Sequence, residues 1–161
     1  MFLSISYFLH LIATVIWLGG LALLIIFALP ALRSGEIDGN RWLQLQQRFL
    51  PWANGSLVIL LLTGFFQMTN DPDYAGFLVL DGTWAWAMLL KHIAYVGMVA
   101  ITFYLQFILY PEIERYRLLQ GVNRNAESRN TTLIAQDKRL LWLNFGCALL
   151  VLLFTAIMTA V

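Results

Sequence analysis

Charged residues are almost absent from four long stretches of this sequence. Residues 1–32, 49–70 and 140–161 contain no Asp, Glu, Lys or Arg, and the stretch 82–111 contains only Lys91. About 20 helical residues cross the roughly 30 Å hydrocarbon core of a bilayer, so each stretch is long enough to span it. None of them shows the strict two-residue alternation that is typical of a membrane β-strand. The pattern therefore predicts four transmembrane helices.

Composition supports a membrane protein and excludes several other classes. Hydrophobic residues make up 60% of the chain and charged residues 12%, whereas a soluble domain carries about 25% charged residues. A net charge of +1 and a single cysteine argue against a nucleic-acid binder and a disulfide scaffold. We predict a single-domain (1–161), all-α, four-helix up-down bundle, with helices at about 4–30, 49–70, 84–110 and 140–160.

The basic residues predict how the bundle is oriented. Nine of the ten lie in the segments 33–48 and 111–139, whereas the segment 71–83 contains three Asp residues and no Lys or Arg. Because basic residues are retained on the cytoplasmic side, we expect the two basic segments to be cytoplasmic linkers. The acidic loop 71–83 and both termini then face the periplasm.

The two histidines of the chain fall at similar depths in this topology. Helices 1 and 3 run in the same direction, and His10 and His92 lie about 9 and 12 Å inside their outer ends at 1.5 Å per residue. Helices 1 and 3 surround one core in an up-down bundle, so both imidazoles can reach a common ligand. An ionisable residue at membrane depth indicates a functional site, because burying it without a partner is costly.

The chemistry that fits this pair best is a b-type haem with both imidazoles as axial ligands. Lys91, next to His92, can meet a haem propionate or instead extend to lipid headgroups. Four further pocket residues are expected, Thr14, Trp17, Gly64 and Tyr95, of which Thr14 and Tyr95 lie one turn below His10 and His92. Packing between helices through small residues is the alternative role for the glycines.

Tryptophans mark the expected membrane interfaces. Trp42, Trp52 and Trp142 lie near the predicted cytoplasmic side, where aromatic belts occur. Trp17 lies in mid-membrane, seven residues after His10 and hence on the same helical face. Its ring can pack against a porphyrin edge.

Methionines near the outer helix ends offer a competing metal site. Met68 ends helix 2, Met88 precedes His92 by one turn, and Met158 lies at the end of helix 4. Thioether sulfur combined with imidazole is a soft ligand set that suits Cu(I). Methionine is also an ordinary filler of apolar space, so this copper site and the haem site both remain open.

Several short motifs resemble those of a known family. His10 followed by Ile16-Trp17-Leu18-Gly19-Gly20, then Arg48-Phe49, Thr63-Gly64, Lys91 and Pro111, resemble the bacterial copper-resistance D (CopD-like) membrane family. The H-x6-W pattern and the helix-3 lysine are also similar to HemJ, a haem-binding membrane protoporphyrinogen oxidase. The resemblance implies a multi-pass protein of the bacterial inner membrane with a periplasm-facing site for copper or haem. His92, the residue after Lys91, is a helix-3 histidine that is not matched to either family's pattern, and it favours bis-histidine haem.

Three functions remain, of which we predict the first and keep the other two as alternatives. The first is electron transfer through haem b, with a quinone, a periplasmic carrier or another subunit of a larger complex or homo-oligomer as partner. The second is copper uptake or delivery, and the third is a HemJ-like porphyrinogen oxidase, which leaves open whether the chain is an oxidoreductase. The sequence contains no HExxH motif and no phosphate-binding glycine loop.

Overall fold

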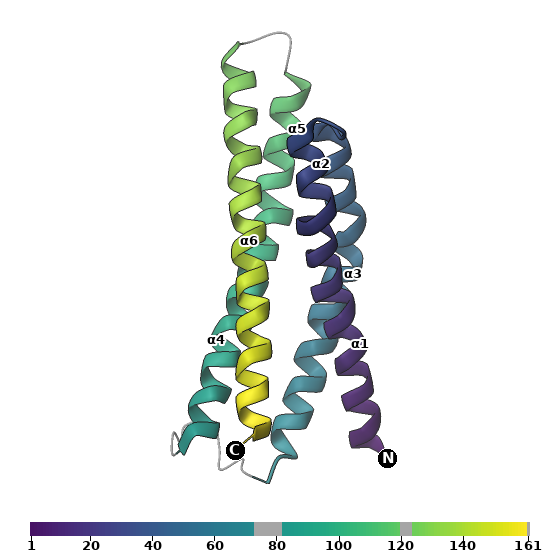
Figure 1. Ribbon diagram of the computed structural model, residues 1–161, viewed down its shortest axis with the longest axis vertical. Coiled ribbons are helices and arrows are strands. Elements are labelled where there is room, and N and C mark those ends of the chain that lie inside the picture. Colours follow the sequence, from purple (N-terminus) through teal and green to yellow (C-terminus); the bar gives the residue numbers. More distant parts are fainter. Residues whose placement is uncertain (73–81, 120–123, 161) are drawn as a thin grey trace.

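The computed structural model describes residues 1–72, 82–119 and 124–160, with the side chains of 124–127 left aside. These residues form four long helical rods in an up-and-down bundle whose two termini lie at the same end (Figure 1). Each rod is long and apolar enough to cross a membrane. The chain is therefore an all-α, four-helix integral membrane protein, as predicted.

Two of the rods contain a π-helical turn just before a proline. The first rod consists of α1 (Phe2–Leu23), the π-turn η1 (Leu24–Ala28) and α2 (Leu29–Ser34), and the third of α4 (Gly82–Tyr104), η2 (Leu105–Leu109) and α5 (Tyr110–Leu118). Pro30 and Pro111 lie in the first turn of α2 and α5. A proline has no N–H to give to the carbonyl four residues earlier, and a locally widened helix accommodates that loss.

The second and fourth rods are unbroken helices, α3 (Gly39–Thr69) and α6 (Arg124–Ala160). Helix α2 ends at Gly35, whose φ of +80° suits glycine, and Asp38 caps the start of α3 by accepting a hydrogen bond from the Arg41 backbone N–H at 2.8 Å. Helix thus continues through much of the segments 33–48 and 111–139 that the sequence analysis assigned to linkers. Charges show where a helix leaves the apolar layer, but a polar helix can continue beyond it.

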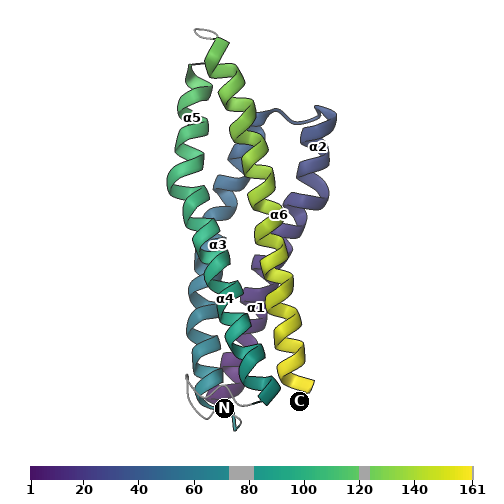
Figure 2. The ribbon, with the colours of Figure 1, turned by 90° about the vertical axis from the view of Figure 1, so that its left-hand side faces the viewer.

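The bundle packs as two pairs of helices. α1 lies chiefly against α3, and α4 chiefly against α6. In Figure 2, α6 runs obliquely from beside α5 at the top, across the rod of α1 and α2, to the C-terminus at the bottom. Glycine permits close approach at one place, because a Cβ on Gly20 would lie only 2.0 Å from the Phe49 ring, whereas Gly19 has open space.

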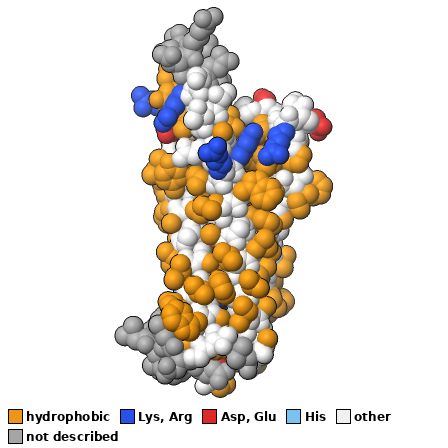
Figure 3. Space-filling model, turned by 60° about the vertical axis from the view of Figure 1, so that its left-hand side comes forward, with side chains coloured by type: hydrophobic (Ala, Val, Ile, Leu, Met, Phe, Trp, Pro, Cys, Tyr) orange, Lys and Arg blue, Asp and Glu red, His pale blue; other side chains and the backbone are white. Residues whose placement is uncertain are grey.

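Large apolar side chains cover the outside of the rods. Val15, Phe27 and Leu62 are each exposed over about two thirds of their surface (70%, 67% and 65%). Figure 3 shows a band of hydrophobic side chains with Lys and Arg gathered at the end away from the termini, which we call the basic end. Such a continuous apolar surface fits contact with lipid rather than water.

Candidate functional site

The imidazole of His10 is held in one tautomer by helix α3. Its Nδ1 lies 2.8 Å from the hydroxyl of Thr63, which in turn donates to the carbonyl of Ile59 at 2.6 Å. A threonine hydroxyl has a single hydrogen, so it accepts from His10 and Nδ1 carries the proton. The lone pair of His10 is therefore on Nε2.

His92 reaches the same tautomer through its own helix. Its Nδ1 lies 2.7 Å from the backbone carbonyl of Met88, one turn earlier in α4. A carbonyl oxygen only accepts, so Nδ1 carries a hydrogen, and in the neutral ring Nε2 is then the nitrogen with the lone pair. A histidine that ligates a metal commonly donates its other N–H to such a partner, which orients the ring.

Both histidines line one cavity of about 250 Å³ inside the bundle. All ten residues proposed from the sequence for the haem or copper site are among its lining residues: His10, Thr14, Trp17, Gly64, Met68, Met88, Lys91, His92, Tyr95 and Met158. They come from all four rods. The predicted juxtaposition of helices 1 and 3 around a shared space is thus present, while the role of each residue remains a proposal.

The three methionines form a compact group at the end of the cavity near the termini. Met68 and Met88 are buried, in one apolar cluster with Trp84 and Ala85, and Met158 packs against that cluster. The structure therefore combines both roles considered for these residues. They fill apolar space, and they bring thioethers to the cavity that the histidines line.

The other wall residues have defined local partners. The Tyr95 hydroxyl donates to the Leu57 carbonyl at 2.6 Å, and the Thr14 hydroxyl donates to the His10 carbonyl at 2.8 Å. Trp17 is buried against Phe49, and its indole N–H has no hydrogen-bond partner among the described residues. A Cβ at Gly64 would lie 3.5 Å from the His10 ring, an ordinary contact, so this glycine borders the imidazole without being required by it.

Among the lining residues to which the sequence analysis assigned no role are two polar ones, Gln67 and Asp71, beside and within a predicted loop. Gln67 lies one turn before Asp71, and both line the cavity at its end near the termini. The Gln67 amide donates to the Ser6 hydroxyl at 3.4 Å. Asp71 belongs to the acidic loop 71–83, of which residues 73–81 lie outside the described structure. Thr63 was noted only as part of a motif, and its contact with His10 required the tertiary structure.

Asp137 is a buried carboxylate that the sequence analysis placed in a linker. It is fully buried in α6 and accepts from the indole N–H of Trp42 at 2.6 Å and from the Gln46 amide at 3.2 Å. Trp42 is accordingly a core residue, not the interfacial one predicted, whereas Trp52 and Trp142 are exposed. Helical spacing is the sequence signal that could have predicted the burial of Asp137. The buried residues on its face of α6 follow that spacing: Leu133, Asp137, Leu141, Asn144 and Ala148.

A metal in this protein has few donor types available. Among the described residues, no three His, Cys, Asp or Glu side chains lie close enough together to hold a metal ion. The soft or borderline donors among the lining residues of the cavity are the two imidazoles and the methionine thioethers.

Fold and site together define a multi-pass membrane protein with a histidine- and methionine-lined cavity between its four rods. Residues 43–158 match the sequence profile of the family described as copper resistance protein D (CopD), and the chain belongs to this family. Comparisons with curated proteins and with solved structures find no match. The matched region includes His92, Lys91 and the three cavity methionines, and it begins after His10. The similarity to HemJ stays a prediction.

Proposed function

We propose that this protein binds Cu(I) in the four-helix cavity and takes up or delivers that ion at the membrane. One observation carries the proposal: two imidazoles and several thioethers line a single cavity, and five of these donors, from His10, His92, Met68, Met88 and Met158, form the proposed ligand set. Imidazole and thioether together form a ligand set that favours Cu(I) over harder cations. Membership in the copper resistance protein D family supports copper as the cargo.

The tautomers of the two histidines support metal binding. In each, a hydrogen bond at Nδ1 leaves the lone pair on Nε2 and limits rotation of the ring. The His10 ring is anchored to a neighbouring helix and the His92 ring to its own backbone. Less side-chain entropy is then lost when a metal binds, which favours affinity.

A bis-histidine haem b is a second candidate, favoured by the lysine in the cavity wall. Lys91 lines the same space as both histidines, where an ammonium would repel Cu(I) but attract a propionate. The donors fit a haem, but the volume of about 250 Å³ lies below the 300–1,000 Å³ of typical ligand pockets. A porphyrin therefore needs a wider cavity, whereas an ion does not. Bound haem would supply one-electron transfer, to a quinone or a periplasmic carrier, or to porphyrinogen oxidation as in HemJ.

Copper and absorption measurements on the same detergent-purified protein separate the two candidates. We expect one Cu(I) per chain in an anaerobic competition with a chromophoric Cu(I) chelator, and no Soret band. His10→Ala, His92→Ala and Met68→Leu should each weaken copper binding at least about tenfold. Met98→Leu is the matched control, because Met98 lines the deeper part of the cavity outside the proposed ligand set.

Other outcomes decide against the copper proposal. A Soret band with stoichiometric iron, lost in both histidine variants and retained in Met68→Leu, would establish the haem candidate instead. Equal losses of copper in Met98→Leu and Met68→Leu would contradict the proposed ligands.

We further propose the bacterial inner membrane as the location, with the basic end in the cytoplasm. The support is the distribution of Lys and Arg, which lie at the basic end except for Lys91. The cavity then opens near the periplasmic side, where the methionines lie.

A further inference from the structure

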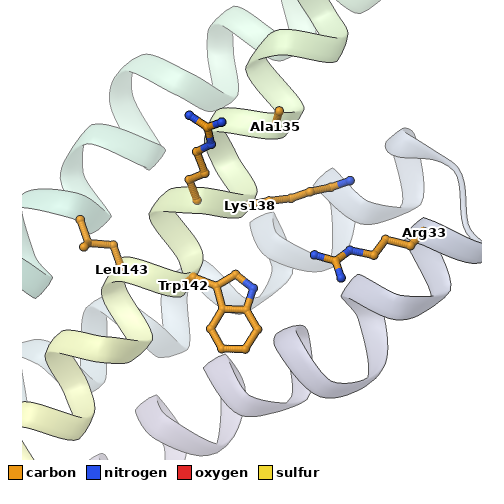
Figure 4. A pocket seen from close by; sticks show the side chains of 6 residues that line it. Arg33, Ala135, Lys138, Trp142 and Leu143 are labelled. Atoms are coloured by element: carbon orange, nitrogen blue, oxygen red, sulfur yellow. The ribbon is translucent and has the colours of Figure 1, made fainter.

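A second pocket lies at the basic end of the bundle, on its flank between α2 and α6. It measures about 560 Å³ and is lined by Arg33 from α2 and by Ala135, Lys138, Arg139, Trp142 and Leu143 from α6. Figure 4 shows the Lys138 side chain and the Trp142 ring extending from α6 toward Arg33. The first and last rods of the chain therefore share this pocket. It is separate from the cavity that the two histidines line.

The lining of this pocket carries three positive charges and no negative one. Within the described part of the chain, no carboxylate forms a salt bridge with Arg33, Lys138 or Arg139, whereas Arg129 pairs with Glu112 at 3.1 Å. Asp137 is adjacent to Lys138 in sequence, but its carboxylate is in the core with Trp42. The pocket is thus a site of uncompensated positive charge, which attracts an anion.

The pocket also lies at the border of the apolar surface. Trp142 and Leu143 are exposed over half or more of their surface (50% and 57%), and the apolar stretch of α6 begins at Leu140. Tryptophan is favoured at the level of the lipid headgroups, where its ring is partly apolar and its N–H remains wet. The charges therefore lie where lipid phosphates are, with an apolar wall next to them for the start of an acyl chain.

We propose that this pocket binds the headgroup of an anionic phospholipid. The phosphate lies between Arg33 and the basic side chains of α6, and the glycerol and upper acyl chain lie against Trp142 and Leu143. Guanidinium groups suit this role because their planar set of donors matches phosphate oxygens. A membrane lipid is favoured over a soluble phosphate compound because the pocket is continuous with exposed apolar residues rather than enclosed by polar ones.

A lipid in this position has a structural consequence. The main helix contacts are α1 with α3 and α4 with α6, and at the basic end Asp137 of α6 already links the two pairs through Trp42 and Gln46 of α3. An anionic headgroup that contacts Arg33 on one rod and Lys138 on the other joins the two pairs at the basic end. The lipid is then a bound component of the fold. The proposed copper site at the other end of the bundle does not depend on this lipid site.

Native mass spectrometry can test this site with matched charge-removing variants. The protein is equilibrated in detergent with equimolar phosphatidylglycerol and phosphatidylcholine, and the retained lipid is counted. We expect a preference of at least about fivefold for phosphatidylglycerol, since one basic residue near an anionic lipid contributes about that factor. The triple variant Arg33→Gln, Lys138→Gln, Arg139→Gln should lose the preference.

A second triple variant keeps the test specific. Arg41→Gln, Arg48→Gln, Arg115→Gln removes the same charge from exposed residues of the basic end that do not line the pocket, and it should retain the preference within about twofold. Equal losses in the two triple variants would overturn the proposal in favour of general electrostatic attraction. Displacement of phosphatidylglycerol by millimolar inorganic phosphate would overturn the choice of a lipid. Circular dichroism of each variant excludes misfolding as the cause.

Discussion

The Nδ1 atom of His10 donates a hydrogen bond to the hydroxyl of Thr63 at 2.8 Å, across the contact between α1 and α3. Thr63 can act as an acceptor here because its own hydrogen is committed to the Ile59 carbonyl. The orientation of one cavity histidine is therefore decided by a different helix. This relationship makes Thr63 a positioning residue for the proposed metal site.

Replacement of Thr63 by valine should weaken Cu(I) binding about 10- to 100-fold, because the change keeps the shape but removes the acceptor that orients His10. The measurement is the anaerobic competition with a Cu(I) chelator. Thr69→Val is the control, since Thr69 is exposed on the same helix and bonds only to its own helix carbonyls. Unchanged copper affinity in Thr63→Val would show that His10 needs no help from α3.

Removal of the Asp137 carboxylate should destabilise the bundle even though Asp137 lies far from the cavity. Asp137→Leu leaves the Trp42 indole and the Gln46 amide as buried donors without their acceptor, at a cost of about 1–3 kcal/mol each. Asp137→Asn retains one acceptor oxygen and should cost less. Thermal unfolding in detergent ranks the stabilities of these variants. Glu114→Gln is the control, because Glu114 is exposed. Equal stability of all the variants would contradict a structural role for this network.

Gly20→Ala should lower the stability of the bundle by about 1–3 kcal/mol, because the added methyl group overlaps the Phe49 ring. Gly19→Ala, one residue earlier with open space around it, should be neutral or slightly stabilising through its better helix propensity. Unfolding in detergent compares the two. The double change Gly20→Ala, Phe49→Leu should recover part of the loss, and a failure to recover would assign the effect to another neighbour.

Cysteine labelling tests the proposed orientation. In a Cys147→Ser background, Asn70→Cys at the end near the termini should react with a membrane-impermeant maleimide in intact cells. Glu36→Cys, between α2 and α3 at the basic end, should react only after the cells are permeabilised. Both positions are exposed. The reverse pattern would invert the topology and place the methionines at the cytoplasmic side.

The fold class was predictable because a bilayer restricts the choice so strongly. Four apolar stretches that each satisfy the thickness of a membrane leave few arrangements besides a helical bundle. Helix ends were less predictable, since α6 begins at Arg124, 16 residues before the apolar stretch at Leu140, and carries the buried Asp137 in this polar part. A polar helix and a polar loop have similar compositions, and only helical spacing of buried residues separates them.

The sequence predicted several residues that line the cavity, but it did not predict the hydrogen bonds that these residues make with other helices. The depth argument for His10 and His92 relied on helix rise alone, and both residues do line one space. Thr63 and Gln67 were not assigned roles, because the partner of a side chain on another helix depends on how that helix is rotated. Sequence spacing carries no information on that rotation.

By itself, the sequence determined that this chain is a four-helix membrane protein, and it predicted which residues lie at similar depths, because hydrophobicity and helix rise act locally along the chain. The tertiary structure decided which residues at one level face each other. It buried Asp137 against Trp42, anchored His10 to Thr63, and brought Arg33 to the basic side chains of α6. These pairings depend on the packing of whole helices, where shape and hydrogen-bond satisfaction choose among rotations that hydrophobicity leaves nearly equal.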